Sequence, residues 1–451
     1  MSRDPRVPQE MRMTLLRQPM QQRPTPRASG RKLKPRDLVE VPSPTRKPLK
    51  VSFFGHFGTP NPGNEGTLLA IVSRLRALSP DSEFRCICCY PEAVVARDGI
   101  EAVPITTRTH RGIRDRDNPL AKRVLMAFVG VGAELAQYAR AFRELKGTEV
   151  LIFPGTGMVT DAAGLSDWGP YSQFKWVLMA KLRRCRVLFI SVGAGPIDRP
   201  LGRVLVKATL SLADYRSYRD EASRDYLRGI RFPAQRDRVY PDLVFGLPDS
   251  LLSGKHAPTK GARRVVGLGL MEYYGKYSTT DPRPETYPAY LASLAEFAAW
   301  LLEHDYDIRL LLGDADTFVI EDFRSALRAR LGSYDEKRVI DQPIRSVQDV
   351  VGELAATDVV VATRFHNVLL AALLTKPVIS ISFHHKCSSL MRQMRLSEYC
   401  HEIHHMDARR LIAQFQQLEQ NREAVKRLIG QHVDKARVAL NEQYDLLFAC
   451  P

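Results

Sequence analysis

The hydrophobic pattern that organises the chain lies in residues 359–386, VVVATRFHNVLLAALLTKPVISISFHHK. Three β-branched residues, 359–361, form a short apolar run that is typical of a strand buried on both faces. Leucine and alanine then recur at helical spacing until Pro377, where the helix must end. A second apolar run, 378–381, follows at once. A strand, a helix and a strand of this length form a βαβ unit, which predicts a parallel sheet.

Short apolar runs alternate with helical patterns along both halves of the chain. In the first half the patterns predict strands at 50–54, 84–90, 149–153, 186–192 and 217–219, and helices at about 64–78, 120–145, 170–184 and after Asp220. In the second half they predict strands at 264–270, 308–312, 337–341 and 399–404, and helices at 285–304, 318–331, 346–356 and from Asp407 towards Cys450. This repeated alternation is typical of α/β proteins.

A polar segment with Gly and Pro, 249–262, separates the two alternations and predicts an interdomain linker. We therefore expect two Rossmann-like α/β domains, 49–248 and 263–405, which face each other across a cleft. A helical segment, 406–451, follows the second domain. The Pro-, Arg- and Gln-rich residues 1–48 cannot build a core, so we expect a disordered basic tail.

Glycine-rich turns follow three predicted strands of the first domain. They comprise GHFGTPNPGNEGT at 55–67, Gly155 to Gly157 with Asp161, and Gly193 with Gly195. Ligands bind at the carboxyl edge of parallel sheets, and glycine lets the backbone approach a phosphate or a carboxylate. The first loop is neither GxGxxG nor a P-loop. Because ordinary turns use the same residues, ligand contact and simple turn formation are both open at this point.

Cationic and other polar side chains follow two strands of the second domain. Arg364, His366 and Asn367 come after the strand 359–361, and Lys386 comes after the next strand. An arginine, an imidazole and free helix N–H groups make an anion site that also holds an acid or base. The same side chains could instead cap a helix or pair with a neighbouring domain.

Arg219 ends another predicted strand, in the first domain. Asp220 follows it as the expected N-cap of the next helix, with Ser223 in the first turn. A salt bridge from Arg219 to a local aspartate and contact with a ligand are both compatible with this position.

The charge of the chain is concentrated at its N-terminus. The net charge is +16, and residues 1–50 hold 13 Lys and Arg against 4 Asp and Glu. Such a tail could contact anionic lipid, although a solvated extension is the simpler explanation. Basic residues elsewhere are spread rather than clustered with aromatics, so we expect no nucleic-acid partner. A chain of 451 residues with 44% hydrophobic residues is long enough for two ordinary domains.

Seven scattered cysteines, no apolar segment in the first 50 residues and no long uncharged apolar run predict a reduced, cytoplasmic protein. Its tail could make it peripheral to the inner face of a membrane. The CICC cluster at 86–89 has no second pair at zinc-site distance, so it predicts buried strand thiols. HEIHH at 401–405 matches HExxH, but its alternation predicts a strand, whereas zinc proteases need a helix. We expect no metal.

Six stretches within about residues 50–400 form an ordered set of motifs. They are NPGNEGTLLA (61–70), FPGTGMVTD (153–161), SVGAGPI (191–197), SYRDEASRDYL (217–227), YPDLVF (240–245) and ATRFHNVLLAALLTKPVISISFHHK (362–386). In this order they resemble the polysaccharide pyruvyl transferase family, and the RxH and YRDExS turns are the most specific. The resemblance implies a GT-B-like fold. It also implies transfer of a pyruvyl group from phosphoenolpyruvate to a pair of sugar hydroxyls, which forms a ketal in polysaccharide or glycoconjugate biosynthesis.

The resemblance also implies roles for individual residues. Arg219, Arg364 and His366 would be the catalytic residues of the donor site, with the arginines on phosphoenolpyruvate and His366 moving protons. Lys386 would be a further phosphate ligand. The other expected substrate contacts are Asn367, Gly63, Asn64, Glu65, Gly155, Thr156, Gly157, Gly193 and Gly195. The donor is a substrate, so no cofactor is expected, and the acceptor would be a sugar, an oligosaccharide or a lipid-linked glycan.

The chain departs from the family pattern at three places. Residues 63–66 read Gly-Asn-Glu-Gly where the family has Gly-Asp and then an Ala position, and Thr156 replaces a third glycine. In the family, the first strand of the second domain often ends in Arg, whereas this chain has Met271 and Glu272 there. Two alternatives therefore stay open: a nucleotide-sugar-dependent GT-B glycosyltransferase, and a non-catalytic member of the family.

Overall fold

The computed structural model describes most of the chain. It covers residues 48–59, 61–107, 120–162, 164–166, 168–253, 263–273, 285–312, 318–383 and 385–448. The predicted tail, apart from Pro48, and most of the predicted linker lie outside these residues. Thr45–Pro451 form one compact unit, and every contact described below lies within it.

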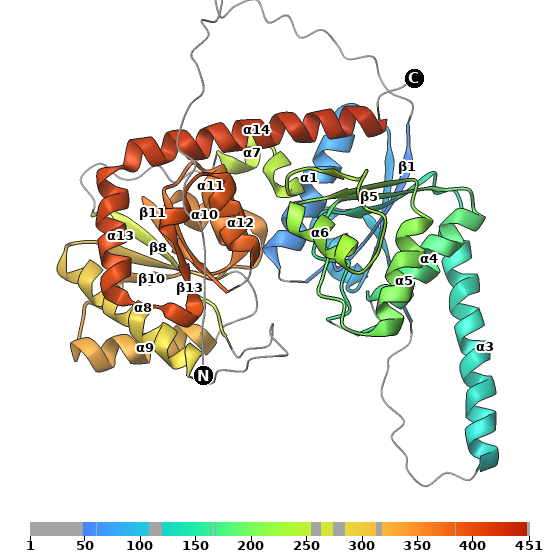
Figure 1. Ribbon diagram of the computed structural model, residues 1–451, viewed down its shortest axis with the longest axis horizontal. Helices are drawn as coiled ribbons and strands as arrows, with labels where there is room; N and C mark the ends of the chain where they lie inside the picture. Colours follow the sequence, from blue (N-terminus) through green and yellow to red (C-terminus); the bar gives the residue numbers. More distant parts are fainter. Residues whose placement is uncertain are drawn as a thin grey trace, which may run out of the picture. The chain divides into compact units, whose positions relative to one another are not determined.

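The first sheet has seven strands in the order β3-β2-β1-β4-β5-β6-β7 (Figure 1). They are β1 (Lys50–Gly55), β2 (Glu83–Cys88), β3 (Glu101–Pro104), β4 (Val150–Pro154), β5 (Arg186–Val192), β6 (Tyr215–Tyr218) and β7 (Arg238–Val239). All neighbouring pairs are parallel. The order runs outward from β1 and β4 in both directions. The crevice above the carboxyl ends of these two strands is therefore the expected place for a ligand.

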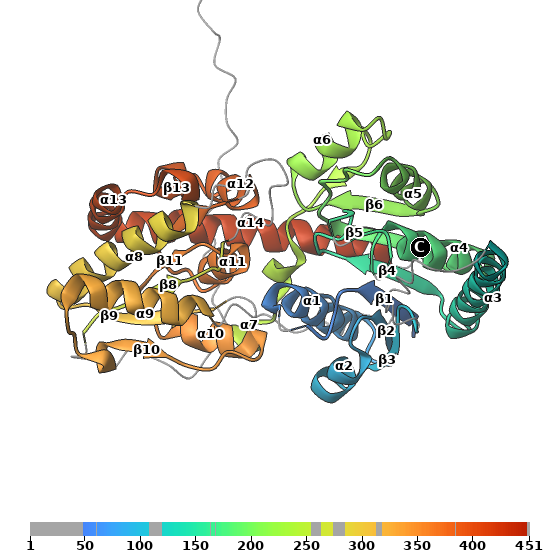
Figure 2. The ribbon, with the colours of Figure 1, turned by 90° about the horizontal axis from the view of Figure 1, so that it is seen from below.

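Helices connect the strands of this sheet and cover both its faces (Figure 2). They are α1 (Pro62–Leu78), α2 (Pro91–Asp98), α3 (Leu120–Glu144), α4 (Pro170–Leu182), α5 (Pro200–Ser211), α6 (Glu221–Gly229) and α7 (Asp249–Leu252). Neighbouring residues of β1 point to opposite faces, as in any strand. Phe53 packs in the core that holds Leu68 of α1, whereas Phe54 packs near Trp176 of α4.

The second sheet has six parallel strands in the order β10-β9-β8-β11-β12-β13. They are β8 (Val265–Gly269), β9 (Asp307–Leu311), β10 (Val339–Asp341), β11 (Val359–Ala362), β12 (Val378–Ser382) and β13 (Cys400–Glu402). Its helices are α8 (Thr286–Glu303), α9 (Phe318–Leu331), α10 (Val347–Ala355), α11 (Phe365–Leu373) and α12 (His385–Gln393). The predicted βαβ unit is confirmed as β11–α11–β12, and every residue of β11 is buried.

One hydrophobic core runs from a face of the first sheet into the second sheet. It includes Val51 of β1, Leu68 of α1 and Val360 of β11. The other face of the first sheet has a separate core that includes Phe153 and Phe189, whose rings stack at 4.2 Å. Because the contact between the two lobes is apolar and continuous, it restricts their relative motion more than a linker alone could.

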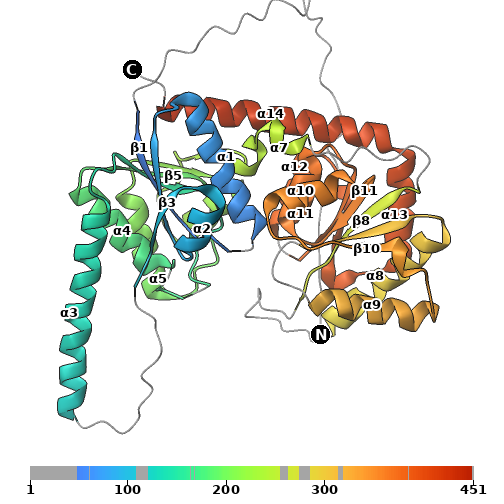
Figure 3. The same ribbon diagram turned by 180° about the vertical axis from the view of Figure 1, so that it is seen from behind.

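Two helices end the described chain, α13 (Ala408–Gln420) and α14 (Arg422–Phe448), and the second returns to the first sheet (Figures 1 and 3). The fully buried amide of Gln443 donates to Ser217 Oγ of β6 at 2.6 Å and accepts from Ser191 Oγ of β5 at 3.1 Å. The sequence predicted helix here, but it did not predict that this helix ties the second lobe to the first.

Some local predictions were wrong or incomplete. Helix α1 begins at Pro62, not near Asn64, because Asn61 accepts hydrogen bonds from the N–H groups of Gly63 and Asn64 and a proline follows it. The elements α2, β3 and α12 were not predicted. They are short. Helix α12, HKCSSLMRQ, is polar overall, but Cys387, Leu390 and Met391 are buried at helical spacing.

Candidate active site

Four turns that each lead into a helix meet at the candidate site. They lie at the starts of α1, α6, α11 and α12. Arg219 and Arg364 come just before α6 and α11, whereas Gly63, His366 and Lys386 lie in the first turns of α1, α11 and α12. Helix N-termini carry partial positive charge and unpaired N–H groups. The site therefore combines cationic side chains with backbone that also favours anions.

His366 packs directly on the first turn of α1. A Cβ added to Gly63 would lie 1.9 Å from Cε1 and 2.1 Å from Nδ1 of His366, so only glycine leaves room for the ring. The ring of Phe365 lies edge-on to the imidazole at 5.1 Å. Two predicted site residues, one from each lobe, are thus in contact.

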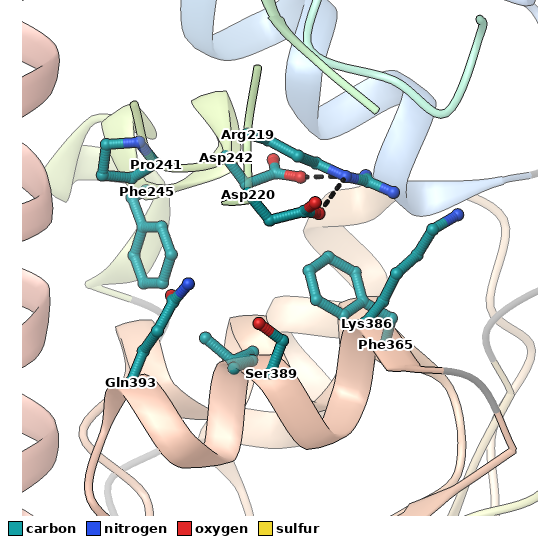
Figure 4. A pocket seen from close by; sticks show the side chains of 10 residues that line it. Arg219, Asp220, Pro241, Asp242, Phe245, Phe365, Lys386, Ser389 and Gln393 are labelled. Atoms are coloured by element: carbon teal, nitrogen blue, oxygen red, sulfur yellow. Dashed lines mark hydrogen bonds and ion pairs between the residues drawn. The ribbon is translucent and has the colours of Figure 1, made fainter. Parts of the chain in front are cut away.

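Arg219 is both ion-paired and part of the site. Its Nη1 lies 3.2 Å from Asp242 Oδ2, and its Nε lies 3.6 Å from Asp220 Oδ2 (Figure 4). Its Cζ lies 5.3 Å from the centre of the Phe365 ring, which is a cation–π contact. The predicted salt bridge of Arg219 is therefore confirmed, and contact of its guanidinium with a ligand stays a prediction.

Glycines of two turns line the guanidinium of Arg219. A Cβ added to Gly193 would lie 2.9 Å from Nε and Nη2 of Arg219. One added to Gly157 would lie 3.3 Å from Lys386 Nζ and 3.7 Å from Arg219 Nη2. Lys386 and Arg219 therefore approach the same glycine turn from different lobes.

The crowding of cations changes their protonation. Burial and the three neighbouring cations, Arg219 first, lower the pKa of His366 to about 3. Burial and then Arg219 lower the pKa of Lys386 to about 7. At neutral pH His366 is therefore a neutral imidazole, and Lys386 is divided between ammonium and amine. A cluster of buried cationic side chains favours an anionic ligand, and the binding of such a ligand stays a prediction.

A narrow pocket lies beside Arg219 (Figure 4). It is lined by Arg219, Asp220, Pro241, Asp242, Phe245, Phe365, Lys386, Ser389, Leu390 and Gln393. Its volume of about 20 Å³ has room for one water molecule. A three-carbon phosphate ester therefore needs flanking side chains such as Lys386 to move before it can fill this pocket.

Several other predicted site residues support the loops. Asn367 is fully buried, and a Cβ on Gly269 of β8 would lie 3.2 Å from its Nδ2. A Cβ on Gly155 would lie 2.9 Å from Leu243, and one on Gly195 would lie 2.8 Å from Tyr226, so both glycines permit close packing. Thr156 is buried in the same turn as Gly155.

Asn64 and Glu65 hold the start of α1. Asn64 Nδ2 donates to the carbonyl of His56 at 3.0 Å. Glu65 forms an ion pair with Arg97 of α2 and accepts a hydrogen bond from the N–H of Val347 at the start of α10, while burial raises the pKa of its carboxyl to about 7. Glu65 therefore links the two lobes, and direct substrate contact by either residue stays a prediction.

The sequence interpretation missed two residues that position Arg219. Asp242 is buried, and burial raises the pKa of its carboxyl although Arg219 opposes the shift. Phe365 supplies the ring on which the guanidinium lies. Asp242 belongs to YPDLVF and Phe365 to the RFH turn, so the motifs contained both residues, but not the contact between the lobes.

The two motifs that suggested metals have structural roles. His401 is buried in β13 and Glu402 is exposed, so HEIHH is not on one helix. The strand predicted at 399–404 is confirmed for Cys400–Glu402 only, because Ile403–His405 form a short 3-10 helix. Cys86 and Cys88 are buried in β2, as predicted. The described residues include no group of three His, Cys, Asp or Glu that could hold a metal ion. Across those residues, each helix is too short or too polar to cross a membrane.

Comparison with known families identifies the class of protein. The polysaccharide pyruvyl transferase family model matches residues 61–385, which is most of the chain. The chain therefore belongs to the polysaccharide pyruvyl transferase family, and the site described above lies almost entirely within the matched residues. No curated protein sequence matches the chain closely enough to add to this result.

Solved structures confirm the GT-B-like fold. A glycosyltransferase from Rickettsia africae aligns over 90% of this chain and 100% of its own, with a TM-score of 0.58 and 10% identity. A UDP-N-acetylglucosamine 2-epimerase aligns over 89% and 96%, with a TM-score of 0.57 and 13% identity. The Neisseria meningitidis UDP-GlcNAc 2-epimerase, solved with UDP-GlcNAc, aligns over 88% and 99%, with a TM-score of 0.54 and 11% identity. At such low identity these proteins share the fold with this chain.

Proposed function

We propose that this protein transfers a pyruvyl group from phosphoenolpyruvate to two hydroxyls of a sugar and so forms a ketal. One observation carries the proposal: Arg219, Arg364, His366 and Lys386 are close enough that the cations lower the pKa of His366. Phosphoenolpyruvate carries a carboxylate and a phosphate, and both groups suit a cluster of buried cationic side chains. Membership of the pyruvyl transferase family supports the same donor.

The arginines suit the two anionic groups of the donor. A guanidinium can donate two parallel hydrogen bonds to a carboxylate or a phosphate. Arg219 is oriented by Asp242 and by the Phe365 ring, which leaves the edge near Gly157 and Gly193 for a ligand. We assign donor binding to Arg219 and Arg364, with Lys386 as the third cation.

The reaction breaks the C2–O bond between the donor and its phosphate and forms two bonds from C2 to sugar oxygens. The two sugar hydroxyls lose two protons in total. C3 gains one proton and becomes a methyl group, and the other proton leaves with inorganic phosphate. His366, neutral at pH 7, is the base for the attacking hydroxyl. Lys386, with its pKa of about 7, is the acid that protonates C3.

The acceptor is a sugar, an oligosaccharide or a lipid-linked glycan. We expect the reaction in the cytoplasm, where the basic residues 1–48 could bring the enzyme to anionic lipid at the inner face of a membrane. The chemistry assigned to these side chains requires no metal and no cofactor.

The test is a transfer assay with labelled phosphoenolpyruvate and a panel of methyl glycosides and short oligosaccharides. The proposal predicts equal amounts of released phosphate and labelled, acid-labile ketal, both lost in Arg364→Ala. Nucleotide sugars are the comparison donors. Transfer from a nucleotide sugar, with no reaction of phosphoenolpyruvate, would replace this proposal with glycosyl transfer. No reaction with any donor by folded protein would favour a non-catalytic role.

A further inference from the structure

A second cavity lies at the carboxyl edge of the first sheet, over β1, β2 and β3. Its volume is about 330 Å³, which is within the range of small-molecule sites. Its lining includes three rings, those of His56, Tyr90 and Trp168, together with Cys89, Ile105 and Thr106. This cavity is much larger than the pocket beside Arg219, and no residue lines both.

The rings of this cavity form a built platform. Those of His56 and Trp168 lie 5.3 Å apart with a tilt of 32°. Tyr90 closes another side, where Gly58, with φ of +82°, lets the loop after β1 come close: an added Cβ would lie 2.3 Å from the Tyr90 carbonyl oxygen. Tyr90 is 54% exposed, so its ring is accessible to a ligand.

The backbone of Trp168 is held in place by a hydrogen bond from Gln173. The buried side chain of Gln173 donates from Nε2 to the carbonyls of Trp168 at 3.0 Å and Met158 at 2.8 Å. Met158 is next to Gly157, the glycine that Lys386 approaches. One wall of the cavity is therefore joined to the donor cluster through a single side chain and one peptide unit.

The opposite wall is joined to the cluster as well. The carbonyl of His56 accepts a hydrogen bond from Asn64 Nδ2 at 3.0 Å. The imidazole ring of His366 packs against Gly63, the residue before Asn64. The cavity therefore flanks the loops whose glycines, Gly63 and Gly157, lie against the assigned base His366 and the assigned acid Lys386.

The chemistry of the lining selects among ligands. Of its described side chains none is a lysine, arginine, aspartate or glutamate. A phosphate or a carboxylate would find no fixed countercharge there. The rings present flat apolar faces, and the indole, hydroxyl, thiol and imidazole groups can pair with hydroxyls. A neutral pyranose has apolar C–H faces and a rim of hydroxyls, which matches both properties.

We propose that this cavity binds a neutral pyranose ring of the acceptor, stacked on Trp168 and His56. The assignment rests on the proposed function, since it places an acceptor beside the pyruvyl donor. It narrows the acceptor to glycans with an uncharged sugar at or next to the modified position.

Saturation-transfer NMR with the full chain tests the platform. The probes are the methyl glycosides of glucose, galactose, mannose and N-acetylglucosamine, with uridine as an aromatic competitor that has no pyranose ring. At least one glycoside should show binding in the millimolar range that a single-sugar subsite allows. Trp168→Ala should weaken it at least tenfold, and Trp168→Phe should keep part of it. Trp300→Phe, which changes an indole on α8 outside the cavity, should leave binding unchanged.

Three results would overturn the platform: no glycoside binds to folded wild type, Trp168→Ala binds as well as wild type, or uridine displaces every glycoside. This test needs no phosphoenolpyruvate, so the two proposals can fail separately. If the donor binds and reacts while no glycoside responds to Trp168→Ala, only the platform is wrong. If glycosides bind but the donor does not, the pyruvyl transfer is wrong and a sugar subsite remains.

Discussion

The carboxyl edges of the two sheets differ in what they contribute. The edge of the second sheet supplies two cationic side chains, Arg364 and Lys386, and the imidazole of His366. The edge of the first sheet supplies glycine turns and aromatic rings, and of the assigned donor residues only Arg219 comes from it. Both edges have the same parallel architecture, so the fold alone does not explain the difference.

The difference indicates a division of labour between the lobes. Charge is an efficient way to recognise a small, multiply charged donor, whereas shape and stacking suit an uncharged sugar. Glycine on the first lobe is required because side chains from the second lobe occupy its surface, as His366 occupies that of Gly63. The following predictions test this division, from the largest expected effect to the smallest.

Replacing the assigned base should affect turnover without affecting donor binding. His366→Gln removes the group that takes the hydroxyl proton, and general-base groups contribute roughly 10²- to 10⁴-fold to rate. We expect kcat for ketal formation to fall by about 10³, with the affinity for phosphoenolpyruvate changed by less than tenfold. His304→Gln, which changes a histidine stacked on Trp300 in the second lobe, is the control. An equal loss of binding and turnover would assign His366 to donor recognition instead.

Gly63→Ala should displace His366 from its position. The added Cβ would lie 1.9 Å from the imidazole, so the ring or the start of α1 must move, and a shift of about 1 Å can reduce turnover 10²-fold. Gly66→Ala, in the same helix, is the matched control, because its nearest contact would be 3.4 Å from Val244 Cγ2. Steady-state kinetics with circular dichroism separates loss of geometry from loss of fold. Full activity of Gly63→Ala would show that the contact is unimportant.

Lys386→Met should stabilise the protein, because it removes a buried ammonium beside Arg219. The pKa of Lys386 falls from 10.5 to about 7 on folding, so the unfolded state binds this proton more tightly. Below pH 7 the buried ammonium of Lys386 therefore lowers the free energy of unfolding by its full amount. Between pH 7 and pH 10.5 this destabilisation decreases, so the free energy of unfolding rises. We expect the variant to gain about 1 to 2 kcal/mol in urea unfolding at pH 7, and less at pH 10. A gain that does not depend on pH would indicate better packing rather than relief of charge.

Donor binding should take up protons. At pH 7 about half of Lys386 is neutral, and a bound trianion raises its pKa, so binding should consume about half a proton. Calorimetry in two buffers of different ionisation enthalpy at the same pH measures this number. Lys386→Met should reduce the uptake to nearly zero. Uptake that persists in the variant would move the titrating group to His366.

The fold was largely predictable from the sequence. Runs such as 359–361 and 378–381 are buried on both faces, so composition alone marks them as parallel strands. The short helix α12 was not predicted. It is polar overall, and its few apolar residues, such as Cys387 and Leu390, nevertheless follow helical spacing and are buried. In α14 the buried amide of Gln443 lies among buried apolar residues such as Leu440 and Tyr444, and no local pattern distinguishes it from an exposed glutamine.

The candidate site was predictable in part. Arg219, Arg364, His366 and Lys386 all follow predicted strands, and parallel topology brings strand ends to one edge. The sequence could not show that Asp242 orients Arg219, nor that Gly63 accommodates His366, because these contacts join residues far apart in the chain. Trp168 was not singled out either, since it lies in an irregular loop whose position is set by Gln173.

The central claim is that Arg219, Arg364, Lys386 and the neutral imidazole of His366 form the donor site, and calorimetry of phosphoenolpyruvate binding tests it most directly. Wild type should bind with a dissociation constant between micromolar and millimolar, and Arg364→Ala should bind at least tenfold more weakly. Arg228→Ala, which breaks an exposed ion pair with Asp225, should bind as wild type does. If folded wild type does not bind phosphoenolpyruvate, or if Arg364→Ala binds it equally well, the assignment of the cluster to this donor is contradicted.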